Sequence, residues 1–153
     1  MPEPELQRRS KPRIGRVDPQ PTVKDAYSDW RRTVGHGCYA QDIDWVEWRI
    51  DVDGGVRFVA LIETTFYEDK PHLRDCLPSY CSTVLRRFKE DGQGPVLQRA
   101  SEALQVPAYL VIARYDLAVF FVCRLQDEAW RQMSESAYRR WLINLDGVVR
   151  SAA

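Results

Sequence analysis

The sequence lacks a net charge, a long apolar run and a closely spaced pair of metal-binding cysteines. Its 22 basic and 22 acidic side chains cancel, so no overall field attracts a polyanion. No apolar run approaches the roughly 18 residues of a membrane-spanning helix and no signal peptide is recognisable, so we expect a cytoplasmic protein without a membrane partner. Cys76 and Cys81, the closest cysteines, are separated by four residues, which is too wide a spacing for a zinc knuckle if the pair lies on a helix. All four cysteines are therefore expected to be reduced thiols in or near the core.

What the chain does have is enough apolar content for one globular domain. Of its 153 residues 44% are hydrophobic and 11% aromatic. Residues 1–21 are rich in proline and basic residues and poor in apolar ones, which predicts a disordered basic tail. Such a tail either holds phosphates or is merely solvated. The single domain is expected to span residues 22–150.

The hydrophobic spacing predicts helices alternating with strands. A helix capped by Thr22 is expected over about 23–34, with Ala26, Tyr27 and Trp30 on one side. Further expected elements, in chain order, are strands over 41–51 and 56–66, a helix that ends before Asp91, a helix over 95–105, strands over 108–115 and 119–124, and a helix over 127–145. This order predicts an α/β fold, a four-stranded mixed sheet flanked by helices.

The first two strands form a predicted hairpin with acids at its open end. A two-residue turn at Asp53-Gly54 pairs Val46 with Leu61 and brings Asp44 opposite Glu63. Trp48 then faces Val59, and Ile50 faces Arg57, at the closed end. A turn at Gly54-Gly55 would instead set Asp44 opposite Thr65 and diagonal to Glu63. A bulge or an odd-length loop would break either register.

The predicted register puts two carboxylates on the apolar face of the hairpin. Like charges that face each other destabilise a sheet unless a proton or a cation is shared. A divalent metal bound by Asp44 and Glu63 would resolve the conflict, whereas strand-end acids in water would not need one. Asp42, two residues nearer the open end, is a candidate second carboxylate. Glu47 projects to the opposite face.

This element order, with an acid in one strand and Ala60-Leu61-Ile62-Glu63 in the next, resembles the PD-(D/E)xK nuclease superfamily, which includes restriction endonucleases and Holliday junction resolvases. The resemblance covers roughly residues 22–125. It implies a restriction-endonuclease-like core and a Mg²⁺ or Mn²⁺ site formed by Asp44, Glu63 and the backbone carbonyl of Thr64. By the same resemblance, a metal-bound water would attack a DNA phosphodiester.

The chain departs from the superfamily at Thr65, where the motif has lysine. That lysine orients the attacking water and stabilises charge on the phosphate, so Thr65 would at best position the water through its hydroxyl. Lys70 and Lys24 are the candidate replacements. Asp29 or Asp25 from the first helix and Gln98 from a later helix are candidate accessory residues, with ordinary surface positions as the alternative.

Three functions follow as hypotheses. The leading one is a Mg²⁺-dependent nuclease-like domain that hydrolyses DNA, with Asp44, Glu63 and Thr65 as its catalytic residues. The second is a non-catalytic protein that keeps the nuclease fold to bind nucleic acid or a protein partner. The third is an oligomer, such as a homodimer, with tryptophans and tyrosines at its interface. Basic helix ends suit either a phosphate backbone or the helix macrodipole; they comprise Arg86, Arg87, Lys89, Arg139 and Arg140.

Overall fold

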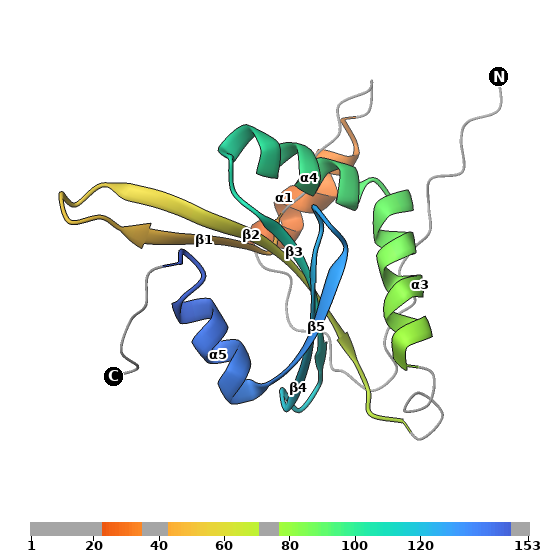
Figure 1. Ribbon diagram of the computed structural model, residues 1–153. Coiled ribbons are helices and arrows are strands. Elements are labelled where there is room, and N and C mark those ends of the chain that lie inside the picture. Colours follow the sequence, from red (N-terminus) through yellow and green to blue (C-terminus); the bar gives the residue numbers. More distant parts are fainter. Residues whose placement is uncertain (1–22, 35–42, 71–76, 148–153) are drawn as a thin grey trace. The chain divides into compact units, whose positions relative to one another are not determined.

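The computed structural model describes residues 23–34, 43–70 and 77–147 (Figure 1). The chain divides into two compact units, Met1–Ala40 and Gln41–Ala153. The first unit contains one described helix, and the second contains all the described strands and the other helices. The predicted basic tail and Asp42 lie outside the described residues.

Helix α1 (Val23–Arg32) confirms the first expected helix. Tyr27 and Trp30, three residues apart, lie on the same side of it, with ring centroids 5.6 Å apart. Both rings are exposed. The helix ends at Arg32, and in its last turn the Trp30 carbonyl accepts hydrogen bonds from the backbone N–H and the hydroxyl of Thr33.

The second unit is an α/β structure with a mixed sheet. Its strands are β1 (Trp45–Ile50), β2 (Val56–Tyr67), β3 (Ala108–Arg114), β4 (Val119–Arg124) and β5 (Ala129–Ser134). They neighbour one another in chain order, and only β2 and β3 run parallel. Helices α3 (Leu77–Glu90) and α4 (Gln93–Leu104) form the crossover that a parallel pair requires. Helix α5 (Glu135–Ile143) follows the last strand.

The expectation of four strands is wrong, because residues 127–145 do not form a single helix. They form β5 and then α5, which Ser134 caps by accepting a hydrogen bond from the backbone N–H of Ala137. Trp130 and Met133 caused the error, since residues three apart share one side of a helix but lie on opposite faces of a strand. In the structure Trp130 packs with the core on one face of the sheet and Met133 with the core on the other.

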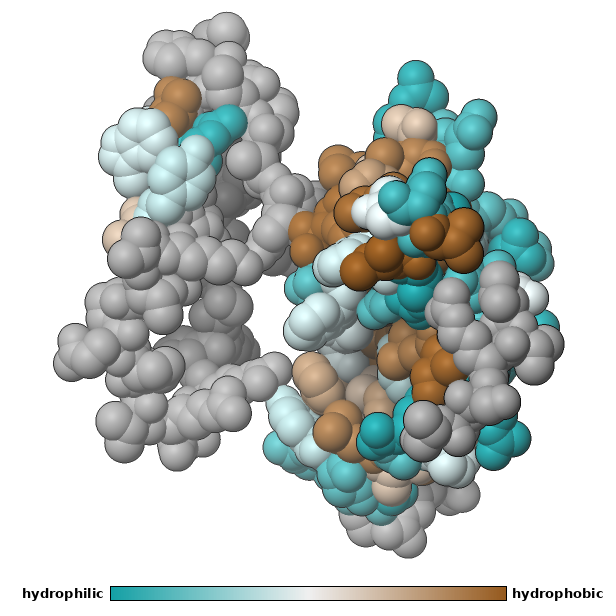
Figure 2. All heavy atoms as spheres, turned by 90° about the vertical axis from the view of Figure 1, so that its left-hand side faces the viewer, coloured by the Kyte–Doolittle hydropathy of each residue, from teal (hydrophilic) through white to brown (hydrophobic). Residues whose placement is uncertain are grey.

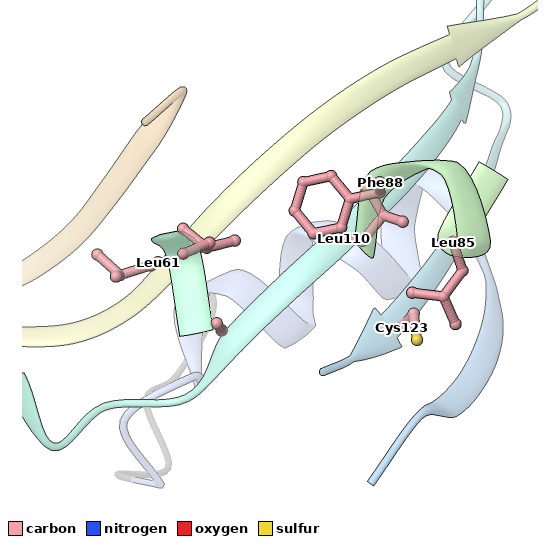
Figure 3. Packing of buried hydrophobic residues seen from close by; sticks show 7 residues of the cluster. Leu61, Leu85, Phe88, Leu110 and Cys123 are labelled. Atoms are coloured by element: carbon pink, nitrogen blue, oxygen red, sulfur yellow. The ribbon is translucent and has the colours of Figure 1, made fainter. Parts of the chain in front are cut away.

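The sheet is covered by helices on both faces. Figure 3 shows the core on the α3–α4 side, where Phe88 of α3 lies beside Leu110 of the sheet and Leu85 of α3 lies beside Cys123. Leu61 belongs to the same core. On the other face α5 supplies Tyr138, Trp141 and Leu142 to a core built on alternate residues of the same strands, namely Ala60, Ile62, Val111, Ala113, Phe120 and Val122. Strands β2 and β3 are therefore buried on both sides, which explains their nearly continuous apolar sequences.

The hairpin register is correct at the open end and wrong at the tip. A five-residue loop over 51–55 pairs Ile50 with Val56, not with Arg57. A β-bulge then shifts the pairing, so that Trp48 faces Phe58 but Val46 faces Leu61 as predicted. The odd-length loop shifts the predicted pairing by one residue, and the bulge shifts it back by one residue. The two shifts cancel at the open end of the hairpin.

Among the described residues, no helix is both long enough and apolar enough to cross a membrane.

Candidate functional site

Glu63 is a buried acid near the middle of β2. Only 8% of its surface is exposed, and Ser101 is the one other buried polar residue in the described part of the chain. Glu63 faces Leu110 on β3, and Leu110 belongs to the core under α3 and α4, so the Glu63 side chain lies on that face. A buried carboxylate costs free energy unless hydrogen bonds or a cation compensate it.

Asp44 and Glu63 are joined across the open end of the hairpin. Glu63 Oε2 accepts a hydrogen bond of 3.3 Å from the backbone N–H of Asp44. Asp44 Oδ2 accepts two hydrogen bonds from Thr64, one of 2.9 Å from its backbone N–H and one of 2.8 Å from its hydroxyl. We call this reciprocal arrangement of Asp44, Glu63 and Thr64 the clasp, because each acid binds a backbone N–H of the other strand.

Asp44 lies at a bend, and this decides where its carboxylate points. Strand β1 begins only at Trp45, so the strict alternation of side chains does not extend to Asp44. Ile43, on the other side of the bend, packs against the core under α3 and α4. The Asp44 carboxylate reaches Thr64, which faces Val111 and so projects toward the α5 side. The two acids are joined through the backbone N–H of Asp44, but their carboxylates lie toward opposite faces of the sheet. The expectation that both carboxylates share the apolar face is therefore wrong for Asp44.

Thr65 occupies the motif-lysine position and is half-buried. It faces Ile112 on β3, and by alternation its side chain lies on the same face as that of Glu63. Lys70, a candidate replacement, is exposed beyond the end of β2 and forms an ion pair of 2.8 Å with Glu68. The hydrogen bond that Lys70 donates to Glu68 raises the pKa of Lys70, so the lysine stays charged beside that acid. The side chain of Lys24 lies outside the described residues.

Of the described accessory candidates, only Gln98 lies in the same unit as the clasp, and no contact among the described residues of that unit joins the two. Asp29 is exposed on α1, which belongs to the other unit. Gln98 is exposed on α4 and lines a surface hollow of about 470 Å³ between the end of α3, the start of α4 and the turn from β4 to β5. Lys89 and Glu128 form an ion pair at that hollow, and no residue of the clasp lines it.

The donor atoms of the clasp suit Mg²⁺ in type. Mg²⁺ binds one or two carboxylates and keeps several waters, so two acids and a backbone carbonyl are a sufficient protein ligand set. Asp44 Oδ1 has no hydrogen-bond partner within the described residues, whereas Oδ2 is held by Thr64. No group of three or more histidine, cysteine, aspartate or glutamate side chains gathers at a metal-binding distance among the described residues. Any metal here would therefore be bound by this small set.

Thr64 is the residue whose side-chain contact the sequence did not reveal. The resemblance assigned it a backbone carbonyl ligand, but here its hydroxyl orients Asp44. A threonine within a strand is common because β-branched residues favour strands, so its identity carries no signal of this contact. Only the position of the bend before β1 could have indicated that the Thr64 hydroxyl contacts Asp44.

Comparison of the chain with models of protein families, with curated proteins and with solved structures gives no match.

Proposed function

We propose that the chain is a Mg²⁺-dependent, nuclease-like protein that acts on DNA phosphodiesters. The observation that supports this most is the buried carboxylate of Glu63, hydrogen-bonded to the backbone of a second, exposed acid at a hairpin end. The adjoining parallel pair of β2 and β3, with a two-helix crossover, is consistent with a restriction-endonuclease-like core. The proposal thus rests on the acid pair and the strand that carries it.

In this proposal Asp44, Glu63 and the Thr64 carbonyl would hold the metal. The ion would supply a bound water of lowered pKa and would offset charge on the phosphate. Thr64 holds Asp44 Oδ2 and thereby fixes how the carboxylate presents its other oxygen. Thr65, on the face of Glu63, would position water through its hydroxyl.

Contacts with the DNA backbone would come from exposed arginines on the helices. Arg86 and Arg139 are committed to ion pairs with glutamates one helical turn away. Arg87 and Arg140 are exposed and form no ion pair within the described residues, so they are the basic helix residues left for phosphates.

A non-catalytic protein that retains a nuclease-like fold is the second candidate. It is favoured by Thr65 at the motif-lysine position and by the commitment of Lys70 to Glu68. In that case the clasp closes the hairpin and needs no metal, because its hydrogen bonds already satisfy Asp44 Oδ2 and the Thr64 N–H.

Titration calorimetry with Mn²⁺ tests the proposal in the wild type and in Glu63→Gln, which keeps the shape of the side chain and removes its charge. Asp53→Asn, at the tip of the same hairpin, is the matched control. We expect binding in the wild type and the control, and none in Glu63→Gln. Circular dichroism verifies that each variant is folded.

The same three proteins are then incubated with linear, branched and single-stranded DNA in Mg²⁺ and in Mn²⁺. Cleavage that disappears in Glu63→Gln supports the nuclease. Metal binding without cleavage favours the non-catalytic protein, and the absence of both metal binding and cleavage in a folded wild type refutes the proposed function.

A further inference from the structure

The β1–β2 hairpin carries an exposed apolar face. It runs well beyond the rest of the sheet and past the end of α4 (Figure 1). The pairings of Trp48 with Phe58 and of Ile50 with Val56 put these four side chains on one face, together with Val46. Trp48 is 50% exposed, Ile50 67% and Phe58 45%, and the two valines are also exposed. We call these five residues the hairpin patch.

The two faces of the hairpin differ in chemistry. On the opposite face Arg49 donates to Glu47 and to the backbone carbonyl of Leu142, next to the end of α5. Arg57 on the same strand pair forms ion pairs with Asp51 and Asp146. Around these ion pairs that face is polar and is tied to α5 and the turn after it, while Trp45 is an exposed aromatic residue on the same face, farther from the tip. The hairpin patch contains no charged or polar side chain, so it offers nothing to a phosphate or an acidic peptide.

The hairpin patch is comparable in area to the largest apolar patch of an ordinary soluble monomer. From the exposed fractions of its side chains it presents roughly 500 Å² of apolar surface. The largest apolar patch of an ordinary soluble monomer is about 300–600 Å² and is often functional. A stable interface buries about 800 Å² on each partner, with an apolar centre and a polar rim. The patch therefore has the area of an interface centre. Figure 2 looks at the side toward which the hairpin points and shows apolar, brown atoms gathered there.

We propose that the hairpin patch binds the same patch of a second copy of this chain. A two-fold axis brings each residue of one copy onto the equivalent surface of the other, so an uncharged face meets an equally uncharged one. Two twisted ribbons stack face to face as sheets do in a sandwich, with Trp48 and Phe58 near the centre. The equal numbers of basic and acidic residues leave no long-range repulsion between copies. This inference does not depend on the proposed function.

Sedimentation equilibrium of the full chain over a range of concentrations tests the interface. Trp48→Ala removes a central aromatic residue twice in a symmetric dimer, and we expect the dissociation constant to rise by about 100-fold or more. Trp45→Ala is the matched control, since Trp45 is a tryptophan of similar exposure, 59% against 50% for Trp48, on the opposite face of the same strand. It should leave the dissociation constant within about threefold of the wild type.

Ile50→Lys is a second variant at the most exposed position of the patch, chosen because it leaves the monomer core untouched. It should give a folded monomer by circular dichroism at concentrations where the wild type is a dimer. A wild type that stays monomeric at every concentration overturns the proposal. So does a Trp45→Ala effect as large as that of Trp48→Ala, or a dimer that survives Ile50→Lys.

Discussion

The hydrogen bond from the Thr64 hydroxyl to Asp44 can be measured with a double-mutant cycle of Asp44→Ala, Thr64→Val and the double variant. Valine keeps the shape of threonine and removes only the hydroxyl donor. The bond is 2.8 Å long and ends on a carboxylate oxygen. Hydrogen bonds to charged groups contribute about 1.5–3 kcal/mol when buried, and this one is exposed, so we expect a coupling free energy of about 0.5–1.5 kcal/mol.

The cycle is needed because each single variant changes more than this bond. Thr64→Val also alters strand propensity and local burial, and Asp44→Ala also removes the acceptor of the Thr64 backbone N–H. These effects occur in both arms of the cycle and cancel in the coupling free energy. Urea unfolding of the four proteins, monitored by far-ultraviolet circular dichroism, gives the free energies of unfolding. A coupling below about 0.3 kcal/mol would refute the clasp geometry.

Two other predictions concern core packing and pH. Gly94→Ala should lower the free energy of unfolding by about 1–3 kcal/mol, although alanine favours helices, because its Cβ would lie 2.9 Å from the Cα of Lys89. The exposed neighbour Gln93→Ala should change that free energy by less than about 0.5 kcal/mol in the same urea experiment, and equal stability of both variants would contradict this reasoning. Burial, followed by the charge of Glu47, raises the pKa of Tyr138 to about 12, so folding favours the neutral phenol. The resulting stabilisation is complete below the ordinary pKa near 10 and is lost as pH rises through about 12. The unfolding temperature should fall less steeply with pH over that range in Tyr138→Phe than in the wild type. Identical slopes would contradict the raised pKa of Tyr138.

The sequence predicted those parts of the fold in which the spacing of apolar residues allowed only one interpretation. The run from Ala108 to Arg114 is apolar at nearly every position and short, as a strand buried on both faces must be. Residues 129–134 were ambiguous because Trp130 and Met133 satisfy a helical spacing as well as opposite faces of a strand. The hairpin pairing of β5 with β4 decided between the two, and this pairing is not visible in the spacing of residues 129–134 alone.

The pairing of Asp44 with Glu63 was predictable from the sequence, but the contacts of their carboxylates were not. Asp44 and Glu63 could be paired by counting back from the turn, and they are joined by a hydrogen bond in the structure. The direction of the Asp44 carboxylate could not be predicted, because it depends on the bend that lets Ile43 enter the core. Strand periodicity applies only within the strand, and Asp44 lies one residue before it.

The bulge in β2 is what aligns the two acids. Between Trp48 and Ile50 the pairing follows the five-residue loop, and if it continued unchanged Glu63 would face Ile43 rather than Asp44. The extra residue at Val59 shifts the strand by one position, so Glu47 meets Ala60 and the ladder leads on to Asp44 and Glu63. The pairing of Trp48 with Phe58 lies on the loop side of the bulge and is set by the loop. Bulges commonly redirect side chains, and this one keeps Phe58 and Leu61 on one face of the hairpin while it aligns the acid pair.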